Sequence, residues 1–253
     1  PHASVGKFSQ WRKEMATSFG RMRTSHPTSR AVEFDAGLRR YMLGIYTHMG
    51  LGLLLTGLVA LGVAMTPALY EPIFNTPLKW VAIFAPLAFV LLLSFGLHQM
   101  TAAMARAAFY VFAAVMGVSM ASIFLVFTGE SIALAFFTAA AVFLAMSLWG
   151  YTTSTDLSRW TSVLMVGLIA VVIASIVNIF LASSTLQIVF SIAGILVFTG
   201  LTAWDTQRLK NEYAAHVGSE TISKMSIIGA LSLYLNLINL FQLLLTFMGQ
   251  RRE

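Results

Sequence analysis

Seven long apolar stretches, separated by short polar connections, make up most of the chain after residue 40. A helix needs about 20 mostly apolar residues to cross a bilayer, because it rises only about 1.5 Å per residue. The stretches that approach this length are residues 41–65, 79–97, 105–127, 132–149, 161–181, 186–204 and 225–248. The pattern predicts an all-α membrane protein, a compact bundle of seven transmembrane helices.

The same pattern divides the chain into three parts. Residues 1–40 form a polar, basic leader, residues 41–249 form the transmembrane domain, and residues 250–253 form a short tail. The connection at residues 66–78 contains three prolines. We see no internal repeat and no second, soluble domain.

Composition supports a membrane protein and excludes several kinds of chemistry. Hydrophobic residues make up 58% of the chain and charged residues only 10%, with a mean hydropathy of +0.79, whereas a soluble domain carries about 25% charged residues. The chain has no cysteine, which excludes disulfides and cysteine nucleophiles. It also lacks His-Glu-x-x-His, Gly-x-Ser-x-Gly and phosphate-binding glycine loops. We therefore expect no enzymatic activity, no cofactor and no firmly assigned metal site.

Positive charge is concentrated in the leader. Eight of the 16 Lys and Arg residues precede the first apolar stretch, and 13 of the 16 fall on one side if the leader is cytoplasmic. This bias predicts a cytoplasmic amino terminus and attraction to anionic lipid head groups. No aromatic-interleaved basic stretch accompanies the charge, so the expected partner is the lipid bilayer and not nucleic acid.

The carboxyl terminus leaves one alternative topology open. Seven spans place it on the outer side, yet Arg251 and Arg252 lie beside it. Because positive residues favour the cytoplasmic side, these two arginines favour a six-span arrangement with a re-entrant last segment.

The last apolar stretch carries a stripe of polar side chains. Gly229, Ser232, Asn236 and Asn239 are spaced by three and four residues, which places them on one face of a helix. Lipid cannot satisfy amide groups, so this face should point into the bundle and the last helix should be central. Interhelical hydrogen bonding alone would also explain the stripe.

Asp205 closes the sixth apolar stretch and is the first candidate functional residue. An ionised group at bilayer depth costs about 2.5 to 3.5 kcal/mol, so it must be neutralised, paired or hydrated. On a continued helix Arg208 would lie beside it, and a simple interfacial salt bridge is the alternative to a functional role. Arg106 and His98, at a cytoplasmic connection, are further possible counter-charges, although solvation is their default.

Two segments near the carboxyl terminus have a distinctive sequence, namely residues 203–208 (AWDTQR) and 230–241 (ALSLYLNLINLF). They resemble the two signatures of the Bax inhibitor family, also known as the transmembrane Bax-inhibitor-motif family, and especially its bacterial members. The similarity begins near residue 34 and includes residues 74–80 (FNTPLKW) and 94–96 (SFG). The resemblance implies a last helix enclosed by the other six, a bacterial inner membrane location, and a pH-sensitive leak of calcium down its gradient.

The resemblance also implies a site on the last two helices. In the family, two aspartates there form a proton-sharing pair that is thought to sense pH and gate the pore. Asp205 matches the first aspartate, but the second position holds Asn236. Two close carboxylates cannot both ionise easily, and an Asp–Asn pair lacks this repulsion. We therefore expect an ion path or gate along Asp205, Ser232, Asn236 and Asn239, with a pH switch that is weakened or shifted.

Two other functions remain open. The chain could be a membrane-embedded regulator or structural subunit that binds other membrane proteins, such as a membrane protease, and the 40-residue leader would suit that role. A proton-coupled transporter is disfavoured because a single buried acid is available for a relay. One acid is also weak support for divalent selectivity, so monovalent or negligible conduction stays open.

Overall fold

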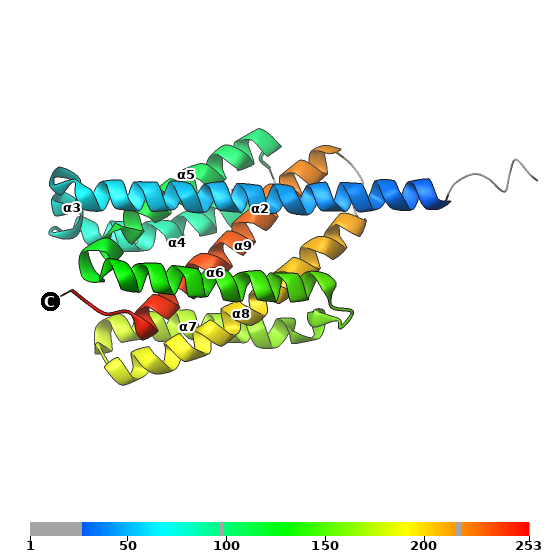
Figure 1. The fold of residues 1–253 in the computed structure, drawn as a ribbon. Coiled ribbons are helices and arrows are strands. Elements are labelled where there is room, and N and C mark those ends of the chain that lie inside the picture. Colours follow the sequence, from blue (N-terminus) through cyan, green and yellow to red (C-terminus); the bar gives the residue numbers. More distant parts are fainter. Residues whose placement is uncertain (1–26, 97–98, 216–218, 253) are drawn as a thin grey trace, which may run out of the picture. The chain divides into compact units, whose positions relative to one another are not determined.

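The computed structural model describes residues 27–96, 99–215 and 219–252, and most of them are helical (Figure 1). Within these ranges the only extended pairing is an isolated bridge between Phe127 and Arg251. The helices are α2 (Pro27–Met65), α3 (Pro67–Phe74), α4 (Leu78–Gly96), α5 (Ala102–Val126), α6 (Gly129–Thr152), the 3-10 helix η1 (Leu157–Trp160), α7 (Thr161–Leu181), α8 (Ser184–Ala215) and α9 (Ser219–Met248).

By its internal contacts the chain divides into two units, Pro1–Arg40 and Tyr41–Glu253. The described part of the first unit is helical, and most of its side chains from Val32 onward are exposed. Most of the basic residues of the predicted leader lie in residues 1–26, outside the described part of the chain. The second unit contains the helical bundle.

Six helical segments among the described residues are long and apolar enough to cross a membrane. They are formed by α2, α5, α6, η1 with α7, α8 and α9. A seventh is the pair α3 and α4, which meets the same criterion together but bends by 88° at its break. The proline-containing connection predicted at residues 66–78 is therefore partly helical, and the all-α membrane fold is confirmed.

The end of the chain lies against the connection between α5 and α6. The Thr128 N–H donates to the Gln250 carbonyl (3.1 Å), and the Arg252 N–H donates to the Val126 carbonyl (2.9 Å). The Gln250 N–H donates to Ser131 Oγ (2.9 Å). Because α9 begins next to the end of α8 and finishes at the other end of the bundle, it crosses the bundle completely (Figure 1). α9 is one unbroken helix of 30 residues, which favours a complete span over a re-entrant last segment.

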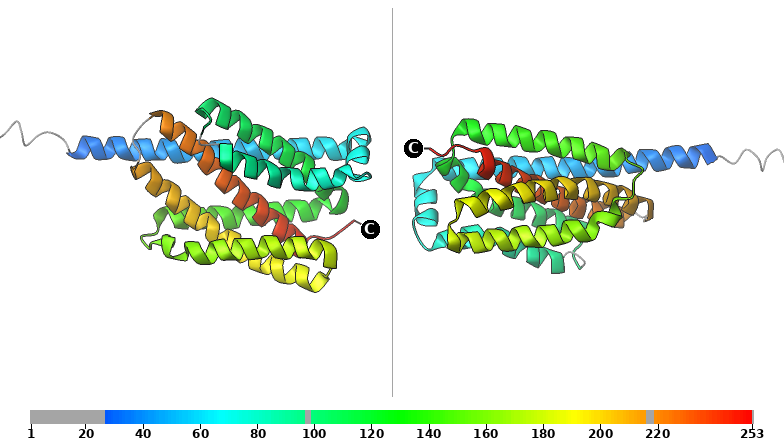
Figure 2. Two further views of the ribbon diagram at one scale, coloured as in Figure 1. Left: turned by 180° about the vertical axis from the view of Figure 1, so that it is seen from behind. Right: turned by 90° about the horizontal axis from the view of Figure 1, so that it is seen from below.

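The prediction that the last helix is central is confirmed. In the most apolar 18-residue window of α9, 72% of the residues are buried, compared with 6% in the corresponding window of η1 and α7. It packs against α5, α6 and α8. Seen from behind, α9 also passes between α4 and α7 (Figure 2).

Two glycines allow neighbouring helices to approach closely. At Gly150 of α6 an added Cβ would overlap with the backbone carbonyl of Ala203 in α8. At Gly117 of α5 it would come within 2.7 Å of the Thr56 carbonyl oxygen in α2. Small residues commonly allow such backbone contact between membrane helices. These contacts hold α2 and α8 in place around α9.

Candidate functional site

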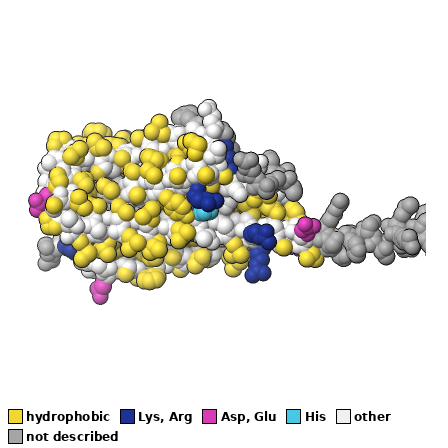
Figure 3. Space-filling model, turned by 90° about the horizontal axis from the view of Figure 1, so that it is seen from above, with side chains coloured by type: hydrophobic (Ala, Val, Ile, Leu, Met, Phe, Trp, Pro, Cys, Tyr) yellow, Lys and Arg dark blue, Asp and Glu magenta, His cyan; other side chains and the backbone are white. Residues whose placement is uncertain are grey.

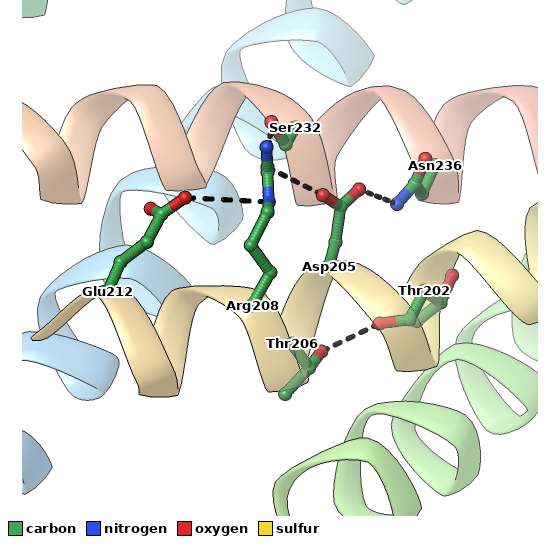
Figure 4. Close-up of polar contacts among 7 residues, drawn as sticks. All are labelled: Thr202, Asp205, Thr206, Arg208, Glu212, Ser232 and Asn236. Atoms are coloured by element: carbon green, nitrogen blue, oxygen red, sulfur yellow. Dashed lines mark hydrogen bonds and ion pairs between the residues drawn. The ribbon is translucent and has the colours of Figure 1, made fainter. Parts of the chain in front are cut away.

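Asp205 lies within α8 and not at its end. The apolar stretch was expected to close at Trp204, but α8 continues to Ala215. The continuation places Arg208 one helical turn after Asp205, on the same side of the helix. Asp205 is only 6% exposed, and its carboxylate points toward α9 (Figure 4).

Both carboxylate oxygens of Asp205 have partners within the protein. Asn236 Nδ2 donates to Oδ2 at 2.7 Å, and Arg208 Nη2 contacts Oδ1 at 2.6 Å. Arg208 Nη2 is also 3.4 Å from Ser232 Oγ, and its Nε is 3.8 Å from Glu212 (Figure 4). Arg208 stacks on the Trp204 ring at 4.9 Å. The cluster therefore joins α8 to α9 through one acid that is shared between a guanidinium and an amide.

A cavity of about 500 Å³ adjoins this cluster. Its other walls are mostly apolar and come largely from α4, α5 and α7, with Leu87, Met116 and Leu168 among them. Its polar wall belongs to α8 and α9 and consists of Asp205, Arg208, Ser232, Asn236, Asn239 and Gln242. The structure thus brings all four predicted path residues to one wall of one cavity, within a bundle that spans the membrane.

The comparison with known proteins agrees with this architecture. A family model described as "Inhibitor of apoptosis-promoting Bax1" matches residues 38–253. The chain belongs to the Bax inhibitor family. It is 44% identical over 231 residues to the uncharacterized protein RP147 of Rickettsia prowazekii, covering 91% of this chain and 98% of that one. It is 43% identical over 224 residues to inner membrane protein YbhL of Escherichia coli K12, covering 87% and 96%.

Of the other two possible counter-charges, Arg106 is not among the described partners of Asp205. In this Bax inhibitor family protein Arg106 lies on α5, one helical turn before Tyr110. His98 lies outside the described residues. Asn239 Nδ2 donates to the Leu235 carbonyl of its own helix at 2.8 Å. In the described part of the chain no three His, Cys, Asp or Glu side chains gather where they could hold a metal ion.

Gln207 is a residue whose role the sequence pattern did not reveal. Its Nε2 donates to the Thr155 carbonyl at 2.7 Å, and its Oε1 accepts from the Leu157 N–H at 2.8 Å. Its amide group therefore fastens the connection between α6 and α7 to α8. Its position in AWDTQR could have indicated this role. Successive residues of a helix point about 100° apart, so Gln207, two residues after Asp205, must face a different neighbour.

Thr206 is linked to α6 and α2 through a chain of hydroxyl groups. Its Oγ1 donates to the Thr202 carbonyl at 2.8 Å, so it can only accept from Ser147 Oγ, which lies 3.0 Å away. Ser147 in turn accepts from the hydroxyl of Tyr46. Because the chain ends on a backbone carbonyl, it provides no proton route to Asp205. It ties α2, α6 and α8 together.

Tyr234 was also missed, although it lies in the second signature segment. It is fully buried in α9, and the Phe109 and Phe112 rings meet it edge-on at centroid distances of 5.7 and 5.8 Å. Its hydroxyl is 2.6 Å from Thr56 Oγ1. Thr56 Oγ1 lies 2.8 Å from the Ala113 carbonyl and donates there. Tyr234 therefore links α9 to α2 and α5 on the side away from the cavity.

Proposed function

We propose that this protein is a cation leak of the Bax inhibitor type, with calcium as the expected ion and the cavity beside Asp205 as part of its path. The observation that carries the proposal is a carboxylate, 6% exposed, on the wall of a cavity of about 500 Å³ inside a membrane-spanning bundle. Ionisable residues within membrane spans commonly mark ion pathways. The oxygen atoms of Ser232, Asn236 and Asn239 are ligands of the kind that hard cations prefer.

The ion pair with Arg208 supports a closed resting state. The guanidinium contacts one oxygen of Asp205, so the acid and base together carry no net charge. A cation that moves along the cavity must compete with Arg208 for the carboxylate. Glu212, 3.8 Å from Arg208 Nε, is a second carboxylate that can retain the arginine. In this proposal, conduction requires Arg208 to turn from Asp205 toward Glu212.

Asn236 supports a weaker pH response than that of a family member with two aspartates. Its amide donates a hydrogen bond to Asp205, which requires no shared proton. The repulsion between two ionised carboxylates, which makes such a pair retain a proton, is absent. We expect flux through this protein to vary only modestly with pH.

The proposed orientation places the amino terminus in the cytoplasm of a bacterium. The junction between α8 and α9 would then be cytoplasmic, next to Lys210 and Lys224, and the carboxyl terminus would lie outside. The bias of Lys and Arg residues supports this arrangement. The relative YbhL is named an inner membrane protein, and we propose the inner membrane for this chain too.

A second candidate is a membrane-embedded regulator or structural subunit that binds other membrane proteins without transport. The observation that favours it is that both oxygens of Asp205 are already satisfied within the protein. In this second role the paired acid holds α8 against α9. We propose no catalytic role in either case.

Calcium flux into liposomes that contain the purified protein separates the two candidates. Asp205→Asn keeps the shape of the side chain and removes its charge, and we expect flux to fall at least about tenfold, since charged hydrogen-bonding partners contribute about 1.5 to 3 kcal/mol. Asp156→Asn is the control, because this exposed acid caps η1 through Ser158 and asparagine caps equally well. Equal flux for the wild type and Asp205→Asn would favour the partner-binding role.

A further inference from the structure

A second polar cluster lies away from the cavity, between α2 and α5. His48 Nδ1 and the Tyr110 hydroxyl form a hydrogen bond of 2.9 Å, and the two rings meet at a centroid distance of 6.1 Å. Arg106 precedes Tyr110 by one helical turn, on the same face of α5. Three polar side chains from two helices therefore meet at one place.

Arg106 has no acidic partner in the described part of the protein. The ion pairs found there both belong to Arg208, whereas Arg106 is exposed. Figure 3 shows a histidine side chain beside Lys or Arg side chains on a face that is otherwise largely apolar. An exposed guanidinium on a membrane-spanning helix requires an anion or water, because hydrocarbon cannot solvate it. The surface of α2 and α5 around Arg106 indicates which anion would bind there.

The surface that continues from this cluster is hydrocarbon. On α2 and α5 the contacts advance together, because Gly52 lies against Phe109 and Thr56 bonds to Ala113. The two helices therefore run in the same direction, and residues that follow His48 lie beside residues that follow Arg106. The exposed side chains beyond the cluster are Leu51, Leu54 and Leu58 of α2 and Val111 of α5. A polar cluster at one end of an apolar strip suits an amphiphilic ligand, whose head group would meet the cluster and whose hydrocarbon chain would lie on the strip.

We propose that Arg106 and His48 bind the phosphate group of an anionic phospholipid, whose acyl chains lie along the apolar strip of α2 and α5, while the Tyr110 hydroxyl donates to His48 Nδ1 and holds the imidazole in place. The planar guanidinium matches two phosphate oxygens, which makes arginine well suited to this group. His48 retains its Nε2, since its Nδ1 is engaged with Tyr110. The charge of Arg106, unpaired in the described structure, favours an anionic lipid over a zwitterionic one, which brings its own cation. The site does not depend on the cation leak proposed above.

Native mass spectrometry of the purified full-length protein tests this site. The delipidated protein is mixed with equal amounts of phosphatidylglycerol and phosphatidylcholine, and the retained lipids are counted. We expect about tenfold preference for phosphatidylglycerol, and Arg106→Gln should reduce it about tenfold. Arg159→Gln removes an exposed arginine from another connection and should retain the wild-type preference. Equal retention of both lipids by the wild type would overturn the proposal.

A second variant guards against a folding defect in Arg106→Gln. Tyr110→Phe keeps the aromatic ring and removes one hydrogen-bond donor, so the preference should fall about threefold. Thermal unfolding in lipid-free detergent shows whether each variant is folded. If the lipid preference is unchanged in Tyr110→Phe and in folded Arg106→Gln, the surface binds lipid without this cluster and the inference is wrong. Selective binding of glycerol phosphate without acyl chains would identify a soluble anion in place of a lipid.

Discussion

On one face of α9, Tyr234 is fully buried and its hydroxyl bonds to Thr56 at 2.6 Å. On another face of the same helix, Asn236 bonds to Asp205 at 2.7 Å beside a cavity of about 500 Å³. Both faces satisfy a polar group inside the membrane, but only the second combines an ionisable group with free space. A polar residue in a membrane helix therefore does not by itself indicate an ion path. In this protein the proposed ion path is placed where an ionisable side chain also adjoins a cavity.

The largest effect on the free energy of unfolding should come from removing the Tyr234 side chain from the packed face of α9. Tyr234→Ala removes a ring that Phe109 and Phe112 enclose, and the free energy of unfolding should fall by about 3 kcal/mol. Leu144→Ala, at a surface position of α6 that is 63% exposed, should change it little. Denaturant unfolding in detergent provides the measurement. A loss below about 1 kcal/mol would show that this face is not tightly packed.

Gln207→Ala should have the next largest effect, because it releases the connection between α6 and α7 from α8. It leaves the Leu157 N–H and the Thr155 carbonyl without their partner, which should cost about 2 kcal/mol of unfolding free energy. Gln207 does not line the cavity, so calcium flux should be unchanged. Gln207→Glu keeps one of the two bonds and should lose less stability. Altered flux in a stable Gln207→Glu protein would extend the path beyond the cavity wall.

Arg208→Gln tests the face of α9 that adjoins the cavity. Without the guanidinium, Asp205 loses its counter-charge and becomes available to a cation, so calcium flux should rise about fivefold, equivalent to about 1 kcal/mol. Glu212→Gln removes the second carboxylate that can retain Arg208, so it should lower flux. Both are measured in liposomes at one pH. Lower flux in Arg208→Gln would mean that the arginine assists the cation and does not oppose it.

The smallest effect is expected where the end of the chain meets the bundle. Ser131→Ala removes the acceptor for the Gln250 N–H and a partner of Thr128 Oγ1. Hydrogen bonds between membrane helices average about 0.6 kcal/mol, so the free energy of unfolding should fall by about that amount. Denaturant unfolding in detergent tests this. A loss above about 2 kcal/mol would show that this contact, and not the packing of Tyr234, determines the position of α9.

The apolar stretches predicted most of the fold because span length is a local property. Residues 161–181 were predicted as a helix, and α7 has those bounds. The end of α8 was not predicted, since Thr206, Gln207 and Arg208 looked like the start of a connection. Thr206 and Gln207 find partners on other elements, and Arg208 pairs with Asp205 one turn earlier. The partners of Thr206 and Gln207 are distant in sequence, and no local pattern reveals them.

The candidate site was predictable in part for the same reason. The spacing of Ser232, Asn236 and Asn239 placed them on one face of a helix. That Asp205 would face them depended on how far α8 continues. The cavity itself depends on the side chains of α4, α5 and α7 and on where these helices leave α9 uncovered. Only the three-dimensional arrangement gives that information.

Calcium flux measured across a pH series, for the wild type and Asn236→Asp in the same liposomes, tests the central claim most directly. Asp205 and residue 236 lie at hydrogen-bonding distance, so a second carboxylate there would have to share a proton with the first. We expect a modest pH response in the wild type and a much steeper one in Asn236→Asp. If both proteins respond to pH identically, the pair formed by Asp205 and residue 236 does not control flux.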